Sequence, residues 1–476
     1  MNEDITHQND YFIKYWEPLE NRTDNVSEFF KDYLTLKLPK TPNYNNIYWN
    51  FVDFYKQHVT DKQVFLESLS NYAIAYQQVT ESNSGYPNID SILKRLNHLN
   101  VGVAKPFLMA IMFDLNQNKI TSDQFYKILQ TIESYIARRM IVKIPSNALN
   151  KVFGTLYRDM YRLSENSNAP LNEIVNYLIL RKTNSARIPS DEEIVNSLSQ
   201  NDFYHINSAF RTYLFERLEN YDNIENLQIY QGIAEQKYSI EHIMPQHLNE
   251  SWRENLGNDY EKIHSQYLNV IGNLTLTGYN SQYSNRSFAE KQNMKKGFKD
   301  SHFVNLNKIP AHVTQWGEDE IKERTTQLTN LALSIWKLPQ TTYQPKNKTK
   351  EAIIYDGIQT FIGDKIKGYS FINDEVHSVN KWKNFYIDIV QQIADLNITL
   401  LTNFVISESN KKDNYRYFIL DSKINKENLP DYFEISTGLF LKTNISNWNK
   451  FQVIKHLFDI YQIPYDNLEI YLRENR

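Results

Sequence analysis

Residues 239–247 read SIEHIMPQH, and residues 269–291 read NVIGNLTLTGYNSQYSNRSFAEK. Each contains a short run of β-branched and apolar residues beside proline or glycine, a pattern that is typical of strands or strand ends. The first run carries a Glu-His pair, Glu241 and His242, shortly before Pro245, which favours the end of a strand. The two stretches therefore predict a small β-structure with two chemically useful side chains at one end.

The composition limits the class of protein to which the Glu241-His242 pair can belong. A chain of 476 residues with 41% hydrophobic residues can bury the cores of roughly two to four domains. It has no cysteine, which excludes disulfides and thiolate zinc sites, so any metal must take oxygen or nitrogen ligands. The polar N-terminus and the lack of a run of about 18 apolar residues favour a cytoplasmic protein with no membrane contact.

The first 230 residues predict a helical domain. Apolar residues recur at helical spacing in 121–141, and Thr121 and Gln124 have the spacing of a capping box at its start. The residues of this predicted buried face are Phe125, Ile128, Leu129, Ile132 and Ile136. Further helices are predicted at 27–35, 62–77, 105–116, 169–181 and 203–219.

The pattern of apolar and polar residues changes after residue 230. A second unit, 231–338, contains the two short strands, a polar helical insertion between them and a long helix at 317–336. A Pro/Thr/Lys-rich linker follows at 339–352. Residues 353–476 alternate strand and helix patterns and predict a small α+β domain. The predicted fold class is mainly α with α+β parts.

The Glu-His pair suits the hydrolysis of a phosphodiester. That reaction needs a base to activate water and a cation to neutralise charge on the phosphate. His242 is a candidate base, and the carboxylate of Glu241 is a hard donor that suits Mg²⁺ or Mn²⁺. Neighbouring side chains on a regular strand point to opposite faces, so the two residues share one site only if the strand end is irregular.

Three asparagines complete this candidate site. Asn273 is placed to hydrogen-bond the backbone of the loop that carries His242, and so to hold the base. Asn280 can offer an oxygen to the same cation, and Asn285, near the start of a predicted short helix, is either a helix cap or the actual ligand. In an Asn-rich chain such spacings also arise by chance.

Positive charge gathers directly after the asparagines. Residues 284–299 hold five basic residues against one acidic residue, a local net charge of +4 in a chain whose net charge is −4. Lys291, Lys295 and Lys299 share one helical face if the helix continues through Gly297, and Arg286 lies just before them. The alternatives are a solvated helical face and a phosphate-binding edge for DNA.

The order of these motifs resembles a known family. Glu-His-Ile-x-Pro-Gln, then Gly-Asn-Leu-Thr-Leu, then Asn-x4-Asn-x2-Phe-x2-Lys is similar to the HNH nuclease domain of GmrSD-like, modification-dependent (type IV) restriction endonucleases. The segment EHIMPQ also resembles the DHIVPQ segment in the HNH domains of RNA-guided CRISPR nucleases. Residues 316–336 resemble the helix that closes the family's nuclease domain, and parts of 10–141 resemble its helical segment.

The resemblance implies an HNH ββα-metal fold at 231–338 and a DNA endonuclease. His242 would be the general base, Asn273 the residue that holds its loop, and Glu241 a metal ligand. Asn280 or Asn285 would complete a site for Mg²⁺ or Mn²⁺. This sequence has Glu where the motif often has Asp and Asn where it often has His, and both changes keep oxygen or nitrogen donors.

Members of the family usually begin with a ParB-like nucleotide-binding domain that carries an Asp-Gly-Gln-Gln-Arg motif, and no such motif occurs here. We therefore expect that domain on a separate partner chain, or a truncated gene product. The expected substrate is foreign DNA with modified bases. Two alternatives stay open: a catalytically silent DNA-binding or regulatory subunit that keeps the HNH scaffold, and an RNA-directed nuclease.

Overall fold

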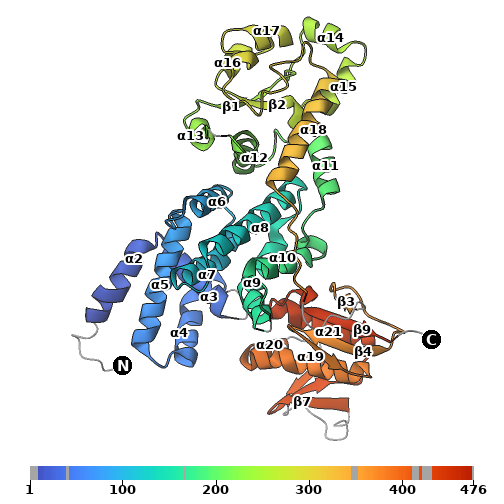
Figure 1. Ribbon diagram of the computed structural model, residues 1–476. Helices are drawn as coiled ribbons and strands as arrows, with labels where there is room; N and C mark the ends of the chain where they lie inside the picture. Colours follow the sequence, from blue (N-terminus) through green and yellow to red (C-terminus); the bar gives the residue numbers. More distant parts are fainter. Residues whose placement is uncertain are drawn as a thin grey trace.

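The computed structural model describes residues 9–38, 42–165, 167–223, 225–344, 352–409, 417–420 and 431–473, except for the side chains of a few of them, among which is Asn280. Figure 1 shows the described helices of the N-terminal half at the left and in the middle of the molecule, a small β-containing unit at the top and a second α+β unit at the lower right. The predicted class, mainly α with α+β parts, is confirmed.

The N-terminal part consists of packed helices. It opens with a single π-helical segment, η1 (Phe12–Trp16), and short 3₁₀ turns connect several of the longer helices. The α-helices are α2 (Glu17–Arg22), α3 (Val26–Lys37), α4 (Ile47–His58), α5 (Lys62–Thr80), α6 (Pro87–His98), α7 (Lys105–Asn116), α8 (Ser122–Ile141), α9 (Leu149–Ser164), α10 (Leu171–Leu180), α11 (Asp191–Gln200), α12 (Ser208–Asn220) and α13 (Ile229–Ala234).

Helix α8 is central because 13 of its 20 residues are buried. The predicted capping box is present: the Thr121 side chain accepts from the Gln124 backbone N–H, and the Gln124 side chain accepts from the Thr121 N–H. The whole predicted apolar face is buried. Its C-terminal turn also holds Arg138, which is fully buried and donates to the carbonyl oxygens of Pro189 and Trp336. Arg138 therefore ties α8 to the end of the long helix near residue 336.

Helix α12 begins at Ser208, five residues later than predicted. Residues 201–207 form a loop instead, because the Oδ1 atom of Asp202 accepts the backbone N–H groups of Tyr204 and His205. This side chain competes with helix formation for the backbone donors. The loop approaches the β-structure described next.

The two predicted strands are present as an antiparallel pair, β1 (Ser239–His242) and β2 (Leu274–Thr277). The register is regular, with Ile240 opposite Leu276 and His242 opposite Leu274. Leu274 and Leu276 pack into the same apolar core as the N-terminal helices. The core is thus continuous across residue 230, where the sequence predicted a domain boundary.

A smaller apolar core lies on the other side of this hairpin. It contains Ile243, Met244, Trp252, Phe288 and Trp316, which come from the loop after β1 and from the segments around the hairpin. The helices of this unit are α14 (Glu250–Leu256), α15 (Tyr260–Tyr267), α16 (Asn280–Tyr283), α17 (Phe288–Asn293) and α18 (Glu318–Ile335). The predicted helical insertion is therefore the pair α14 and α15, and the predicted long helix is α18.

Helix α18 packs directly on the turn that leads into β2. A methyl group at Gly272 would overlap Oγ1 of Thr325 and the carbonyl oxygen of Ile321, so only glycine fits this approach. The fully buried Arg324 donates to the carbonyl oxygens of Gly272, at 2.6 Å, and of Leu306. Helix α18 therefore fixes the backbone immediately before Asn273.

In the part of the C-terminal unit that the structure describes, two antiparallel sheets and three helices are present. The first sheet has the order β3-β9-β4-β5 and the second the order β6-β8-β7. The strands are β3 (Ala352–Ile354), β4 (Ile366–Phe371), β5 (Asn373–Ser378), β6 (Phe418–Leu420), β7 (Tyr432–Ser436), β8 (Leu439–Lys442) and β9 (Leu468–Leu472). The helices are α19 (Trp382–Leu396), α20 (Ile398–Ser409) and α21 (Asn447–Ile460).

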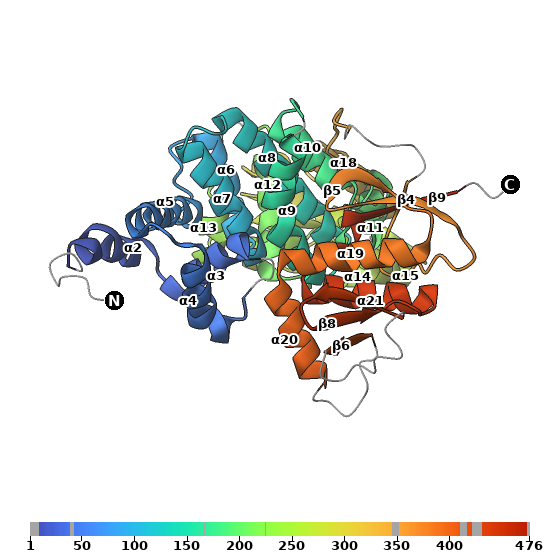
Figure 2. The same ribbon diagram turned by 90° about the horizontal axis from the view of Figure 1, so that it is seen from below.

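Ion pairs and hydrogen bonds hold this unit against the N-terminal helices (Figure 2). Lys151 of α9 pairs with Asp459 of α21 at 2.7 Å, and Arg181 at the end of α10 pairs with Glu469 of β9 at 3.1 Å. The described part of the predicted linker is also bound: Thr341 donates to Glu173 of α10. Residues 345–351 of that linker lie outside the described residues.

No single helix in the described parts of the chain is long and apolar enough to cross a membrane. Only α19 and α20 reach that length together, and they meet at a bend of 105°.

Candidate functional site

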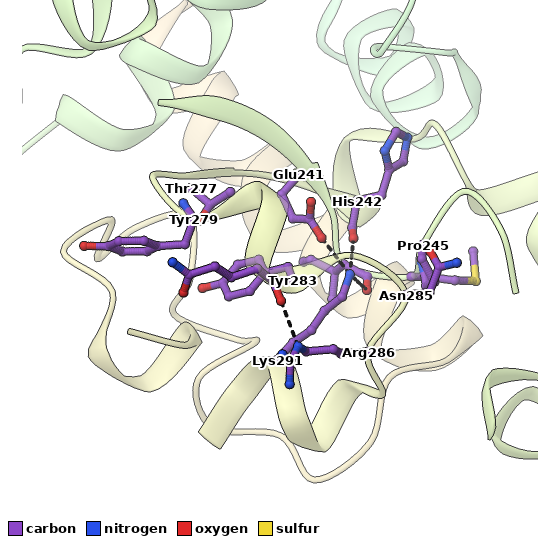
Figure 3. Close-up of polar contacts among 12 residues, drawn as sticks. Glu241, His242, Pro245, Thr277, Tyr279, Tyr283, Asn285, Arg286 and Lys291 are labelled. Atoms are coloured by element: carbon purple, nitrogen blue, oxygen red, sulfur yellow. Dashed lines mark hydrogen bonds and ion pairs between the residues drawn. The ribbon is translucent and has the colours of Figure 1, made fainter. Parts of the chain in front are cut away.

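The Glu-His pair occupies the last two positions of β1. Because the strand stays regularly paired with β2 through His242, the two side chains leave it on opposite faces. Figure 3 shows the carboxylate of Glu241 directed toward Lys291 and the imidazole of His242 directed away from both. The irregular strand end that would bring the two side chains into one site is absent from this described strand. The pair therefore has two separate environments.

Glu241 faces α17 and is paired with Lys291. The Nζ atom of Lys291 donates to Oε1 of Glu241 at 2.6 Å and to the carbonyl oxygens of His242 and Ile243 at 2.9 and 3.2 Å. The side chain of Lys291 is 0% exposed and that of Glu241 is 6% exposed. Burial raises the pKa of Glu241 and lowers the pKa of Lys291, and their mutual attraction opposes both shifts.

The helix that would align the three lysines on one face does not continue through Gly297. Helix α17 ends at Asn293 because Met294 takes an extended conformation, so Lys295 and Lys299 do not continue the face of Lys291. Lys291 is buried and cannot meet a phosphate on the surface in this conformation. Lys295 is exposed, and the exposed Lys299 donates to Oδ1 of Asn293 at 2.7 Å.

Asn273 is fully buried and holds the loop after β1. Its Oδ1 atom accepts from the backbone N–H of Met244 at 2.8 Å and from Nε1 of Trp316 at 3.1 Å. Its Nδ2 atom donates to the carbonyl oxygens of Met244 and Leu268 at 3.0 and 2.9 Å. These bonds satisfy every polar atom of the amide. They hold both the N–H and the C=O of Met244 in the loop after His242, as expected from the sequence.

The other two asparagines lie beyond β2. The side chain of Asn280 lies outside what the structure describes, so its position as a metal ligand is not observed. Asn285 is exposed, and its carbonyl oxygen accepts from Nδ2 of Asn249 at 2.7 Å. The neighbouring Arg286 is also exposed, and its Nε atom donates to the carbonyl oxygen of Gln282. Asn285 and Arg286 therefore present polar groups to solvent beside Glu241's side of the hairpin (Figure 3).

His242 faces the loop between α11 and α12. The residue is 6% exposed, and the centroid of its ring lies 4.4 Å from the centroid of the Tyr204 ring. Burial lowers the pKa of His242 to about 4, and the hydrogen bond to Asn269 only partly offsets this. The imidazole is therefore neutral near pH 7, the form that accepts a proton.

Sequence reasoning missed the partners of His242. The Nε2 atom of His242 lies 3.0 Å from Oδ1 of Asn269, and Nδ2 of Asn269 donates to Oδ2 of Asp202 at 2.9 Å. Nδ1 of His205 lies 2.8 Å from the same carboxylate oxygen. Asn269 belongs to the quoted stretch, but Asp202 lies 40 residues before His242, directly before the helix predicted at 203–219. No spacing rule connects them.

The donor types around Glu241 fit a hard divalent cation. The Lys291 ammonium stands as a cation among one carboxylate and two carbonyl oxygens, which are ligand types that Mg²⁺ also takes. Among the described residues, no group of three or more His, Asp or Glu side chains is arranged so that it could hold a metal ion. A metal here would need Glu241, amide oxygens, water and substrate phosphate, which is a normal ligand set for Mg²⁺.

The site is a short antiparallel hairpin with a neutral histidine at its end, flanked by a small helix and exposed cations. Comparison with models of protein families gives a more specific result for this region. Residues 188–331 match the family model described as GmrSD restriction endonucleases, C-terminal domain. The resemblance to GmrSD-like restriction endonucleases is confirmed for this part of the chain, and the match indicates a nuclease. A search of curated proteins found no significant match.

The matched region begins at Ile188 and so includes α11 and α12. It therefore contains Asp202 and Asn269 as well as the hairpin, α17 and most of α18. The segment that supplies the partners of His242 belongs to the same family region as the Glu-His pair. A nuclease unit cut at residue 231 would lack Asp202 and Tyr204.

Proposed function

We propose that the protein is a metal-dependent HNH endonuclease that hydrolyses phosphodiester bonds of foreign, base-modified DNA in a restriction or anti-phage defence system. The observation that carries the proposal is the buried, neutral His242 at the end of β1, inside a region that matches restriction endonucleases. The absence of a membrane-spanning single helix from the described parts is compatible with action in the cytoplasm.

His242 would accept a proton from the attacking water. Its Nε2 atom is engaged with Asn269, so Nδ1 is the nitrogen left for the reaction. Asn273 would keep the loop after β1 in place while the substrate binds, because it bonds both the N–H and the C=O of Met244. Positioning of this kind is a large part of what an enzyme contributes to such a reaction.

Mg²⁺ or Mn²⁺ is the proposed cofactor. Bound at this site, it would neutralise charge on the phosphate and lower the pKa of a bound water. Glu241 would hold it with its carboxylate, and Asn285 or Asn280 would add an amide oxygen. Because Oε1 of Glu241 already accepts from Lys291, this role requires the second carboxylate oxygen or an opening of the ion pair.

DNA contact is proposed for the exposed cations Arg286, Lys295 and Lys299. Lys291 is left out of this set because its ammonium is buried against Glu241. A separate ParB-like nucleotide-binding subunit remains the proposed partner, since it would supply the control of activity that the resemblance implies.

One observation favours a second candidate function. The carboxylate of Glu241 is already neutralised by a buried ammonium, and it lies on the face of β1 opposite to His242. A chain that keeps the hairpin as a scaffold for binding DNA, without cutting it, would need no more than this. The two candidates are separated by direct assay.

The test is cleavage of supercoiled plasmid and of heavily modified phage DNA by the full chain, with Mg²⁺, with Mn²⁺ and with EDTA. Metal-dependent cutting that disappears in His242→Ala supports the endonuclease. Cutting that persists in His242→Ala refutes the proposed base. DNA binding without cutting, in the presence of the proposed partner subunit, supports the scaffold. Cleavage of single-stranded RNA in the same assay, without cleavage of DNA, would indicate an RNA-directed nuclease instead of a DNA endonuclease.

A further inference from the structure

A series of hydrogen bonds extends from the His242 side chain, and the proposed chemistry does not yet use it. It runs from His242 to Asn269 and then to Asp202, with contacts of 3.0 and 2.9 Å. Asn269 and Asp202 are half-buried, and His205 at the far end is exposed. A buried imidazole has two neutral tautomers, and the partner of one nitrogen decides which nitrogen keeps its lone pair.

The direction of the hydrogen bonds follows from Asp202. An ionised carboxylate only accepts hydrogen bonds, so the group of Asn269 that faces Asp202 must be the amide NH₂. Hydrogen bonds from the side chain and backbone of His205 lower the pKa of Asp202, although burial opposes this, so the carboxylate is ionised near pH 7. The amide oxygen of Asn269 therefore faces Nε2 of His242, and Nε2 must carry the proton.

The backbone holds the same segments together. The N–H of Phe203 donates to the carbonyl oxygen of Asn269 at 2.9 Å, and Arg211 donates to the carbonyl oxygen of Tyr204. The ring of Tyr204 covers the imidazole, with an angle of 53° between the two planes. The loop between α11 and α12 is thus held to Asn269 by backbone and side-chain contacts and to His242 by the Tyr204 ring, which fixes the orientation of this series of hydrogen bonds.

We propose that Asn269 and Asp202 are positioning residues for His242: they hold it as the Nε2–H tautomer with Nδ1 directed to the reacting water. This inference rests on the proposed role of His242 as the base. Asn269 acts by direct contact with the imidazole, and Asp202 acts through Asn269 by preventing the amide from turning over. The proposal adds to the site two residues from outside the Glu-His and Asn motifs.

The tautomer is measurable without any cleavage. Full-length protein with ¹⁵N-labelled histidine gives ring-nitrogen NMR signals that distinguish a protonated from an unprotonated nitrogen, and His242→Ala assigns the signals of this residue. The expected result for the wild type is a protonated Nε2 and an unprotonated Nδ1. A wild type with a protonated Nδ1 overturns the proposal, whether or not the protein cuts DNA.

Variants test the two positioning residues. In Asn269→Ala we expect a mixture of tautomers and a kcat that is lower by about ten- to a hundredfold with little change in KM, because orientation rather than DNA binding is lost. Asp202→Asn keeps an acceptor for the amide and should retain the tautomer, whereas Asp202→Ala should lose it in part. Asn116→Ala is the matched control, since Asn116 is exposed and bonds only Gln78 among the contacts described for it.

The outcomes separate this inference from the proposed function. A wild-type Nε2–H tautomer that is lost in Asn269→Ala, in a protein that cuts no DNA under any condition, supports the positioning and refutes the nuclease. A tautomer and kcat unchanged in Asn269→Ala and in Asp202→Ala refute the positioning alone. Thermal unfolding of each variant shows that it is folded, and Asp202→Ala removes a side chain that is already 38% exposed.

Discussion

Lys291 donates to Glu241 across the interior of the unit that joins β1 and α17, at 2.6 Å, and neither side chain has appreciable contact with solvent. The same ammonium bonds the carbonyl oxygens of His242 and Ile243, so it also braces the end of β1. A residue expected to meet DNA is thus the internal partner of a residue expected to bind metal. The pair raises the question of whether Glu241 serves the fold, the cofactor or both.

A double-mutant cycle answers that question. Lys291→Met should destabilise the protein by about 3–5 kcal/mol, because it leaves a buried carboxylate without its partner. Adding Glu241→Gln should restore much of this stability, since the buried charge is removed. If Glu241 also binds metal, the stable double variant will still lack metal-dependent cleavage. A double variant with cleavage near that of the wild type contradicts a ligand role for Glu241.

Asn273 should be essential to the site through its loop rather than through contact with substrate. Asn273→Ala removes four hydrogen bonds in a fully buried position and should cost about 2–4 kcal/mol in the free energy of unfolding. The N–H and C=O of Met244 would lose their partner, so the loop after His242 should exchange its amide hydrogens faster. Hydrogen exchange of residues 243–247 measures this, and unchanged protection there would contradict the prediction.

His242 should make the stability of the protein depend on pH. Its pKa is lowered to about 4 in the folded protein, whereas an unfolded histidine has a pKa of about 6.5. Between these values the unfolded chain binds more protons than the folded one. The contribution of the neutral imidazole is therefore complete above about pH 6.5 and is lost as the pH falls toward 4.

The comparison is with His242→Gln, which does not titrate. Between pH 7 and pH 4.5 the wild type should lose about 2–3 kcal/mol more than the variant. Urea unfolding followed by tryptophan fluorescence is suitable, since Trp252 and Trp316 are buried in the small core beside the hairpin. Equal losses in the two proteins would show that the imidazole is not held neutral.

The exposed cations beyond β2 should contribute to DNA binding without reading its sequence. Replacing Arg286, Lys295 and Lys299 one at a time by Gln should weaken binding to all DNA sequences alike. Each replacement that removes a phosphate contact should also reduce the slope of log K against log salt by about 1. Lys127→Gln is the matched control, because Lys127 is an exposed lysine of α8 that pairs with Asp123. An unchanged salt slope in all three variants would move the DNA surface elsewhere.

Much of the fold was predictable because its signals are local. The helical periodicity of 121–141 and the capping box at Thr121 predicted α8, and the strand patterns around Glu241 and Leu274 predicted the hairpin. The loop-holding role of Asn273 followed from its place in the motif, and its hydrogen bonds to Met244 are present. The family resemblance rested on the order of the same motifs. The family model matches residues 188–331, which contain these motifs.

The structure differs from what the local patterns indicate where contacts between distant segments intervene. The row of lysines required a helix that continues past residue 293, but α17 ends there, and the Lys291 side chain is buried against Glu241, 50 residues earlier in the chain. The boundary at 230 assumed that a change of composition marks a break in the core. Leu274 and Leu276 of β2 instead complete the core of the N-terminal helices.

The sequence by itself determined the class of the protein, the hairpin and the identity of its polar residues, because strand patterns and motif spacing are properties of neighbouring residues. Only the tertiary structure decided the environment of each side chain. It placed Glu241 against Lys291 and His242 against Asn269 on opposite faces of one strand. The reason is that burial and hydrogen-bond partners come from segments distant in the chain, as Asp202 and Asn269 show.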